Sequence, residues 1–242
     1  MSRRHGDKRV LYLADGITFS SGPDKWSVPP MKLMSASWTA LVPSGTEPVV
    51  DPAVNLSRVL ATMREPERGT VELMEKNVYR LEYGVRQRLR AKIGFVHGYG
   101  GLLSNRTIRD NIALPVSVHG KMSEAEEDDE VTYTLNRFGL QKVAHMLPHE
   151  VDGGTRWNVC LARALVLRPK WLVLEGIGNW EMDRGQSTSW KALMDRRHTS
   201  DMAVAICLPR RNPGFETWFE KLSGRLIQYH LSQRPQEKRK YA

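Results

Sequence analysis

An acidic side chain, Glu175, follows directly on a fully apolar run, Trp171-Leu-Val-Leu174. Runs of this kind are typical of strands that are buried on both faces of a sheet. An acid at the carboxyl end of such a strand commonly holds Mg²⁺ or acts as a base in α/β proteins. Strand-end acids also cap or pair locally, so Glu175 alone leaves a chemical role and a structural role open.

The turn after the apolar run 38–42 is the second place where phosphate chemistry is expected. A phosphate-binding loop needs glycines, whose N–H groups surround the anion, and a Lys followed by Ser or Thr. The segment has Ser44 and Gly45, but no Lys or Arg lies between Lys32 and Arg58. Acids and prolines occupy it instead, at Pro43, Glu47, Pro48, Asp51 and Pro52. Since proline lacks an N–H donor, this loop is a poor anion cradle.

Short apolar runs supply the strands that position these residues, at 10–13, 38–42, 70–73, 93–96, 171–174 and 202–208. The Gly- and Pro-containing stretch Ser20–Pro30 is typical of a loop. Helical spacing predicts a helix from about Ala53 to before Pro66, whose apolar face carries Leu56, Val59, Leu60 and Met63. Strands that alternate with helices predict an α/β fold with a mostly parallel sheet covered on both faces.

Three later segments also have helical signals. Ser123 and Glu126 fit a capping box at the start of an acidic helix, and Gly139 fits the position after its end. A helix is expected after Gly153-Gly154, and it must end near Arg168 because Pro169 cannot continue it. A further helix is expected over Ser187–Arg197.

The composition limits the class of protein. The 242 residues are 40% apolar and 26% charged, which is ordinary for a globular chain, and no apolar run is long enough to span a bilayer. Without an apolar segment after the basic start, no signal peptide is expected. Cys160 and Cys207 cannot form a disulfide framework and are expected to be buried, so a cytosolic chain is indicated. The net charge of +9 suits a nucleotide, nucleic acid or lipid headgroup without choosing among them.

Two long segments resemble the ATP-binding subunit of an ABC transporter. His149–Glu175 is similar to the family's signature loop, signature helix and Walker B strand in succession, with Leu-Ala-Arg-Ala-Leu at 161–165 and Arg-Pro-Lys at 168–170. Leu102–Pro115 is similar to the segment after the Q-loop, which the family uses to contact its membrane permease. The amino-acid sequence of this segment most resembles that of subunits of Mla/Mce-type lipid transporters.

The resemblance implies an ABC-type P-loop NTPase fold. Its mostly parallel core sheet would carry an N-terminal antiparallel β part and a helical subdomain at about 100–165. Residues 1–232 would form one nucleotide-binding-like domain. The tail 233–242 is basic, has little apolar content and is expected to be disordered, and it would contact anionic lipid if the chain lies under a permease.

The chain departs from the family at each position that handles ATP. Counted back from Leu60-Ala61, the Walker A Lys and Ser/Thr fall near Ala53 and Val54. The remaining replacements are Gly98 for the Q-loop Gln, Glu175 for the Walker B Asp, Gly176 for the catalytic Glu, and Leu208-Pro209-Arg210 at the turn of the switch His. The signature is Val151-Asp-Gly-Gly-Thr155, and the D-loop region 178–183 is barely recognisable.

Phosphoryl transfer depends on positioning and charge neutralisation, so these losses predict that the chain does not hydrolyse ATP in its own site. No cofactor and no metal site are expected, with at most weak Mg-ATP binding. The vestigial contacts would be Ser44, Gly45, Phe19, Asp152, Gly153 and Gly154. Phe19 is either a remnant of the adenine-stacking aromatic or a core residue, and Gly153-Gly154 either approaches a partner's ATP or simply forms a turn.

The resemblance therefore implies a noncatalytic subunit on the cytoplasmic face of a membrane, bound to permease subunits and to a second ABC-type subunit. The permease contacts would be Leu102, Leu103, Asn105, Thr107, Ile108, Asn111, Leu114 and Pro115. Trp157, Trp180 and Trp190 are expected at a dry interface. The alternatives are an ATPase that shares a composite site with an intact subunit, which the carboxylate of Asp152 disfavours, and a nucleic-acid-associated protein, which only the net charge suggests.

Overall fold

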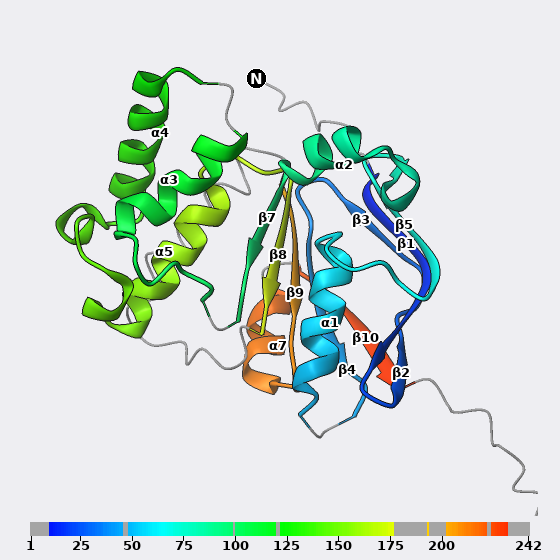
Figure 1. The fold of residues 1–242 in the computed structure, drawn as a ribbon. Coiled ribbons are helices and arrows are strands. Elements are labelled where there is room, and N and C mark those ends of the chain that lie inside the picture. The colour runs from blue at the N-terminus through cyan, green and yellow to red at the C-terminus, as the bar shows by residue number, and fades with distance from the viewer. Residues whose placement is uncertain are drawn as a thin grey trace, which may run out of the picture.

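The structure is a computed structural model that describes residues 10–45, 48–98, 100–119, 122–176, 193, 202–221 and 224–231. Figure 1 shows a twisted sheet in the centre, a helical unit on one side and an antiparallel β part on the other. One sheet runs through the described part of the chain in the strand order β6-β5-β1-β2-β10-β4-β9-β8-β7, with β3 paired to β1.

The core strands are parallel. They are β4 (Trp38–Pro43), β7 (Ile93–Val96), β8 (Trp171–Glu175), β9 (Ala203–Cys207) and β10 (Arg225–Leu231). Every residue of β4, β8 and β9 is buried, as the continuous apolar runs predict for strands covered on both faces. Alternate side chains of β8 enter different cores, since Leu172 and Leu174 face one side while Trp171 and Val173 face the other.

The antiparallel part is built on the long strand β1 (Val10–Ser21). It pairs with β2 (Asp24–Ser27), β3 (Met31–Met34) and β5 (Arg68–Leu73), and β6 (Lys76–Asn77) pairs with β5. The pairing of β2 with β10 joins this part to the parallel strands. The mixed α/β fold, with its mostly parallel core sheet and N-terminal antiparallel part, is confirmed.

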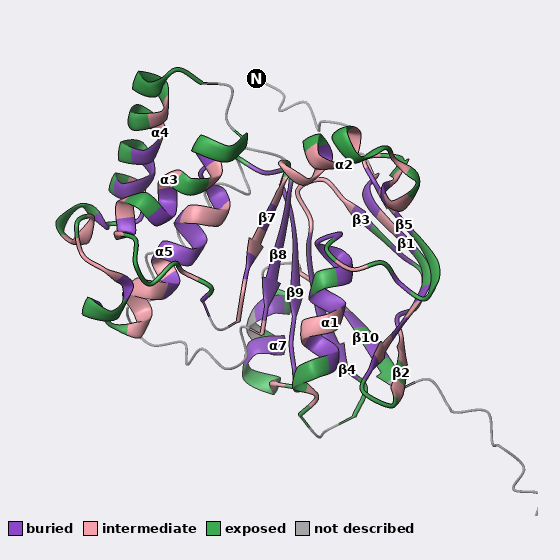
Figure 2. Cartoon of the chain, viewed as in Figure 1, coloured by how far each residue is buried: buried purple, intermediate pink, exposed green. Residues whose placement is uncertain are grey.

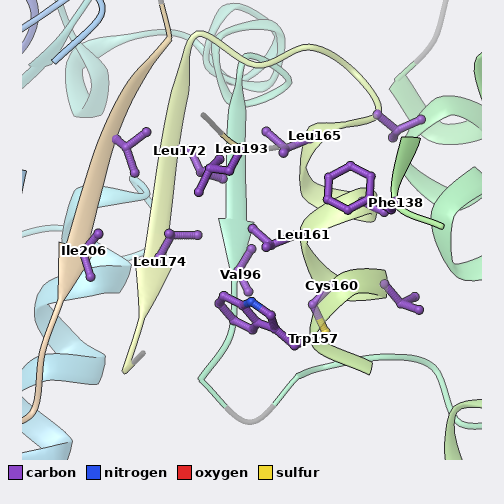
Figure 3. Packing of buried hydrophobic residues seen from close by; sticks show 14 of the residues in the cluster. Val96, Phe138, Trp157, Cys160, Leu161, Leu165, Leu172, Leu174, Leu193 and Ile206 are labelled. Carbon is purple, nitrogen blue, oxygen red and sulfur yellow. The ribbon is translucent and has the colours of Figure 1, made fainter. Parts of the chain in front are cut away.

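Helices cover both faces of the parallel strands. On one face lies α1 (Val50–Leu60), which contributes Leu56, Val59 and Leu60 to the core. On the other face, α5 (Gly153–Leu165) and α7 (Pro213–Lys221) pack on the strands, α3 (Ile108–His119) packs on α5, and α4 (Glu124–Arg137) packs on α3. In Figure 3, Trp157, Leu161 and Leu165 of α5 point toward the strands that carry Val96, Leu172 and Leu174. The short helix α2 (Tyr83–Arg90) leads into β7, and single 3₁₀ turns span 78–80, 141–143 and 148–150.

The helical unit has the caps that its sequence predicts. The Ser123 N–H donates to Glu126 Oε2 at 2.8 Å, and the Glu126 N–H donates to Ser123 Oγ at 3.4 Å, which completes the capping box. Gly139 follows the end of α4 with φ of +67°, a value that glycine adopts without strain. In Figure 2 the outer side of α4 is exposed, while its inner side is buried against α3 and α5.

Several sequence expectations are wrong in detail. Ser20–Pro30 is not simply a loop, because β2 forms within it by pairing with β1 and β10. The first helix begins at Val50 rather than near Ala53 and ends at Leu60, so Met63 lies beyond it and is 54% exposed. Helix α5 begins at Gly153, because the Asp152 side chain caps it, and ends at Leu165.

The predicted helix at 187–197, the D-loop region 178–183 and the tail 233–242 lie outside the described residues, apart from Leu193, which is buried. Trp180 and Trp190 lie outside them too. Among the helices that the structure describes, none has the length and apolarity that crossing a membrane requires.

Candidate functional site

The four positions at which the sequence departs from the family's catalytic residues lie at the carboxyl ends of β8 and β9, beside the first turns of α1. Glu175, Gly176, Gly98 and Pro209 line one small cavity there, together with Val50, Ala53 and Val54. The structure thus brings the four positions around one cavity with Ala53 and Val54, the residues expected near the places of the Walker A Lys and Ser/Thr. The cavity measures about 10 Å³. A space of this size holds about one water molecule and no phosphate group.

Glu175 is only 2% exposed, and partners from two other segments hold its carboxylate. The Ser57 hydroxyl lies 2.7 Å from Glu175 Oε2, and the Gly98 N–H donates to Oε1 at 3.3 Å. His97 Nδ1 lies 3.9 Å from the same Oε1. We call Ser57, His97, Gly98 and Glu175 the carboxylate clasp. Of the two roles that the sequence left open for Glu175, local pairing is the one that this geometry displays.

The clasp keeps Glu175 ionised despite its burial. Burial opposes ionisation, but the nearby His97 side chain and the hydrogen bonds from the Ser57 hydroxyl and the Gly98 N–H outweigh it, so the net effect lowers the pKa of the Glu175 carboxyl group. Burial, with a smaller contribution from the Glu175 charge, raises the pKa of the neighbouring Cys207 thiol well above its usual value. Cys207 is therefore a neutral, buried thiol, as its place in a strand predicts.

Two glycines bring the backbones of β8 and the turn after β7 together at the clasp. A Cβ on Gly98 would lie 3.0 Å from the Glu175 carbonyl oxygen, and one on Gly176 would lie 3.7 Å from Gly98 Cα. Gly176 also has φ of +66°, and its N–H donates to the Cys207 carbonyl at 2.8 Å. A side chain at Gly176 would be strained by this positive φ, so the position expected for the catalytic Glu serves the backbone conformation of the turn.

The segment from β4 to α1 closes the cavity from the other side. The Val49 N–H donates to the Pro209 carbonyl at 2.6 Å, and the Ser44 N–H donates to the Tyr229 carbonyl at 2.9 Å. Tyr229 in turn donates its hydroxyl proton to the Leu208 carbonyl at 2.7 Å. These bonds use two N–H groups at the start of α1 and in the preceding loop, where a P-loop would offer such groups to phosphate.

The described residues of this site do not fit Mg-ATP. The residues that line the cavity include no Lys or Arg, and Glu175, its one carboxylate, already has three partners. Ser44 and Gly45 are exposed beside the site and do not line the cavity.

Two aromatic residues lie elsewhere than the family pattern suggests. Phe19 lies on β1 and is fully buried in the core, so it is not available to stack on adenine. Trp157 is 1% exposed and packs inside the helical core, so its expected place at a dry interface between proteins is wrong. In both cases the ring fills the chain's own interior.

The signature residues Asp152, Gly153 and Gly154 lie at the N-terminus of α5, and none of them lines the cavity. Asp152 caps the helix: its Oδ1 accepts from the Thr155 N–H at 2.8 Å and its Oδ2 from the Thr155 hydroxyl at 2.7 Å. Those two bonds, the hydroxyl first, lower the pKa of the Asp152 carboxyl group. A fixed negative charge thus occupies the helix end that would otherwise favour an anion.

The predicted docking segment divides into a buried support and an exposed face. Ile108 and Asn111 are fully buried, so their expected contact with a permease is wrong. Asn111 instead fastens the preceding loop: its Nδ2 lies 3.0 to 3.1 Å from the carbonyl oxygens of Leu103, Arg106 and Thr107, and its Oδ1 accepts from the Leu103 N–H at 2.8 Å. The other members are partly or largely exposed, namely Leu102, Leu103, Asn105, Thr107, Leu114 and Pro115.

Two residues of α5 that the sequence analysis did not assign to this region also hold the loop. Arg163 donates to the Gly101 carbonyl at 2.8 Å and to the Gly100 carbonyl at 3.3 Å, and Cys160 Sγ lies 3.1 Å from the latter oxygen. Burial raises the pKa of the Cys160 thiol to about 11, so it stays neutral. The polar Arg163 within the apolar stripe of α5 was the available signal, but its partners lie some 60 residues away in the sequence.

A groove opens beside this region. It measures about 510 Å³, and its walls come from α2, β7, α3 and α5. Leu114 and Pro115 of the docking segment line it, so this part of the predicted contact surface borders a cavity large enough for side chains of another molecule.

Comparison with known proteins places the chain in a family. The sequence profile described as "ABC transporter" matches residues 55–175, half of the chain. The methionine import ATP-binding protein MetN 1 of Pseudomonas fluorescens is 32% identical over 120 residues, and MetN 2 of Pseudomonas aeruginosa is 34% identical over 120 residues. Each match covers 50% of this chain and 36% of the relative, so the chain spans about a third of the length of these relatives.

Solved structures agree on the fold. The cbiO1 structure from Clostridium perfringens, described as part of the ABC transporter complex cbiONQ, superposes with a TM-score of 0.66 at 19% identity, over 82% of this chain and 78% of that one. The ATP-binding cassette MJ0796, in a dimeric post-hydrolysis state bound to ADP and Pi, superposes with a TM-score of 0.67 at 19% identity, over 81% and 87%. The chain belongs to the ABC transporter family and has the fold of its ATP-binding domain.

Proposed function

We propose that this chain is a noncatalytic ABC subunit that docks on a membrane permease and stabilises or regulates the transporter complex. The observation that carries the proposal is the carboxylate clasp. Glu175, in the place of the Walker B Asp, is held by Ser57, His97 and Gly98, and the cavity around it measures about 10 Å³. Hydrolysis requires a cation, a metal site and a positioned water, and this arrangement supplies none of them.

The chemistry of the replacements supports the same proposal. Gly176 has no carboxylate to orient water, Pro209 has no imidazole, and Ala53 and Val54 offer neither charge nor hydroxyl to a phosphate. Each such group is typically worth about 10² or more in rate, and the groups act as a unit. The family's activity is ATP hydrolysis, and we propose that this chain contributes structure to its complex rather than turnover.

The direct test is binding and hydrolysis of Mg-ATP by the purified chain. A ligand that binds the folded state raises the melting temperature, so millimolar Mg-ATP should leave it unchanged here and raise it for an intact ABC ATP-binding subunit run in parallel. Hydrolysis by the wild-type chain that disappears in Glu175→Gln would overturn the proposal.

The proposed location is the cytoplasmic face of the membrane, beside permease subunits and a second ABC-type subunit. Purification of the tagged chain from native membranes in mild detergent tests this directly. Recovery of a permease with an intact ATPase subunit would support an asymmetric pair, and a permease alone would support a scaffold. Recovery of neither would contradict the proposed place of this chain in a transporter complex.

A composite-site ATPase is the second candidate, because Gly153 and Gly154 keep the N-terminus of α5 open to close backbone approach. The capping carboxylate of Asp152 opposes it, since this negative charge would face the γ-phosphate of a partner's ATP. Mixing the chain with an intact subunit and Mg-ATP tests the candidate. Nucleotide-dependent dimerisation, measured by sedimentation, would favour it.

The transported substrate is a separate proposal. The resemblance of the sequence Leu102–Pro115 to lipid-transport subunits supports a lipid as the substrate. The basic tail 233–242 would then contact anionic headgroups. Flotation of the chain with vesicles that contain anionic lipid, compared with a chain that ends at residue 232, tests the tail. Equal flotation of the two would remove the lipid contact from the proposal.

A further inference from the structure

The stretch of chain that contains α2 concentrates positive charge. Between positions 76 and 92 there are six basic residues and one acid, Glu82. The basic residues are Lys76, Arg80, Arg86, Arg88, Arg90 and Lys92. No ion pair between described residues includes any of them, whereas Arg109, Arg168 and Arg211 each pair with a carboxylate. The described part of the chain therefore does not neutralise the charge of this stretch from within.

Four exposed side chains form a surface that we call the basic face of α2, namely Arg80, Tyr83, Arg88 and Lys92. Tyr83 is 69% exposed, more than any other large apolar or aromatic side chain in the described part of the chain. Because tyrosine has an apolar ring and a polar hydroxyl, it suits the boundary between water and lipid headgroups. Basic residues beside such a ring are typical of helices that lie on anionic membranes.

Contacts on the inner side of α2 fix the helix to the rest of the fold. Leu89 is buried in the core, and Arg90 donates to the Thr62 carbonyl after the end of α1. In the turn before the helix, the Tyr79 hydroxyl donates to the Arg64 carbonyl. The basic face is thus presented by a helix that is already in place, so little conformational freedom is lost when a ligand binds to it.

The opposite charge gathers on α4. Its first seven residues, 124–130, include six acids. Figure 1 shows α2 and α4 on different sides of β7. An anionic surface attracts α2 and repels α4, so this distribution of charge orients the chain on such a surface as well as binding it there.

Helix α2 also borders the segment that is proposed to contact a permease. Gln87 and Arg90 of α2 line the same groove as Leu114 and Pro115 of that segment. A chain that docks on a permease through this segment therefore brings α2 close to the bilayer. This position favours the phosphates of lipid headgroups over the phosphates of a nucleic acid as the ligand of the basic face.

We propose that the basic face of α2 binds the phosphate groups of anionic phospholipids on the membrane surface beside the permease. The inference rests on the proposed docking function and adds the lipid surface as a second partner. It concerns a folded part of the chain, and it is separate from the contact proposed for the tail 233–242.

Flotation with vesicles tests the lipid contact in the full chain. The vesicles contain phosphatidylcholine with phosphatidylserine, or phosphatidylcholine alone. To exclude the tail, every protein in the assay carries Gln at its four basic tail positions, through Arg234→Gln, Lys238→Gln, Arg239→Gln and Lys240→Gln. We expect binding to the vesicles with phosphatidylserine and little to the others. Equal binding to the two kinds of vesicle would overturn the inference.

Charge removal then locates the contact. Arg80→Gln with Arg88→Gln is compared with Lys142→Gln with Lys221→Gln, which removes the same charge at exposed positions of the helical unit and α7. Each basic residue near an anionic membrane contributes about 5-fold, so we expect the partition coefficient to fall roughly 25-fold for the first pair and less than about 2-fold for the control. All four side chains are exposed and lack described ion pairs, so the circular dichroism spectra should not change. Equal losses in the two pairs would show that net charge, and not the basic face, binds the vesicles.

A fluorescent label tests which helix meets the membrane. An environment-sensitive dye is attached to Tyr83→Cys and, as a matched version, to Tyr133→Cys, which lies on the acidic helix α4 and is 48% exposed. The native Cys160 and Cys207 are buried, so the dye reacts at the introduced thiol. With phosphatidylserine vesicles we expect a blue shift of the emission at position 83 and none at 133. A shift at 133 alone, or at neither position in vesicle-bound protein, would overturn the inference.

Duplex DNA is the competing source of phosphates and is titrated at the same phosphate concentration and salt. We expect it to bind more weakly than the phosphatidylserine vesicles. Equal or tighter binding that is lost in Arg80→Gln with Arg88→Gln would overturn the choice of lipid.

Permease recovery from native membranes is scored separately with the unaltered chain. Recovery of a permease by a chain that does not bind vesicles defeats the inference and leaves the docking function standing. If no permease is recovered, the docking function fails, and the vesicle assay then decides the lipid contact by itself.

Discussion

The carboxylate clasp and the groove differ in how their charged side chains are paired and in how much space they enclose. At the clasp a buried carboxylate has internal partners, and the remaining space is about 10 Å³. At the groove, Arg90 and Arg163 have only neutral acceptors among the described residues, apolar side chains are exposed, and the space is about 510 Å³. The difference teaches that a carboxylate held by internal partners leaves little space around it, whereas guanidinium groups that have only neutral acceptors among the described residues border an open groove.

The strongest way to break this comparison is to remove the carboxylate. Glu175→Ala leaves the Ser57 hydroxyl and the Gly98 N–H without their acceptor in a buried place and enlarges the cavity. We expect the free energy of unfolding to fall by about 3 kcal/mol, measured by urea denaturation. Glu220→Ala, at an exposed position on α7, is the control and should stay within about 0.5 kcal/mol of wild type. A loss as small as the control's would mean that the clasp does not stabilise the fold.

A substitution at Gly94 of β7, which lines the groove, should lower the free energy of unfolding somewhat less. Gly94→Ala places a methyl group against the Ala164 carbonyl and Leu172, so α5 must move away from β7. We expect a loss of about 2 kcal/mol in the free energy of unfolding. Gly84→Ala on α2 has only Arg88 Nη1 nearby, at 3.8 Å, and should stabilise the chain by about 0.5 kcal/mol. If neither Gly94→Ala nor Gly84→Ala changed the free energy of unfolding, the contact between β7 and α5 would accommodate a methyl group without loss of stability.

The clasp can also be weakened from the side of α1. Ser57→Ala removes the hydroxyl that lies 2.7 Å from Glu175 Oε2, and we expect the free energy of unfolding to fall by about 1.5 kcal/mol. Ser117→Ala is a matched control, because Ser117 donates to a carbonyl three residues back, as Ser57 can, but has no carboxylate partner. Its effect should not exceed about 0.5 kcal/mol. Similar losses in the two variants would show that the hydroxyl acts on its own helix alone.

The fold was largely predictable because its strongest signals are local. The continuous apolar runs at 38–42, 171–174 and 202–208 form parallel strands, and the Ser123–Glu126 capping box starts α4. Strand β2 was not predictable, because four residues after Gly22-Pro23 have little preference of their own and pair only where β1 and β10 flank them.

The candidate site was predictable in place but not in its contacts. The position of Glu175 at a strand end follows from the sequence, and so does the loss of the family's cationic and catalytic side chains. Ser57 was missed, because a hydroxyl on the buried face of a helix shows no partner when that partner lies 118 residues away. Ile108 and Asn111 were misplaced at the surface for a related reason, since the loop that Asn111 fastens becomes visible only when the chain is folded.

The smallest expected effect is the pH dependence of the stabilisation that Glu175 gives to the fold. The folded-state pKa of Glu175 is lowered, so its stabilisation is fully present above the unfolded value of about 4.3 and is lost as the pH falls through the folded value. Because burial partly offsets the hydrogen bonds, we expect a smaller change than that in Ser57→Ala. Asp152 and Glu216 shift in the same direction, so the informative quantity is the difference between wild type and Glu175→Gln in urea denaturation from pH 6 to pH 3. The difference in the free energy of unfolding between wild type and Glu175→Gln should become smaller as the pH falls from 6 to 3. A gap that stays constant over this range would mean that Glu175 acts through its shape rather than its charge, and the clasp would then differ from the groove in packing alone.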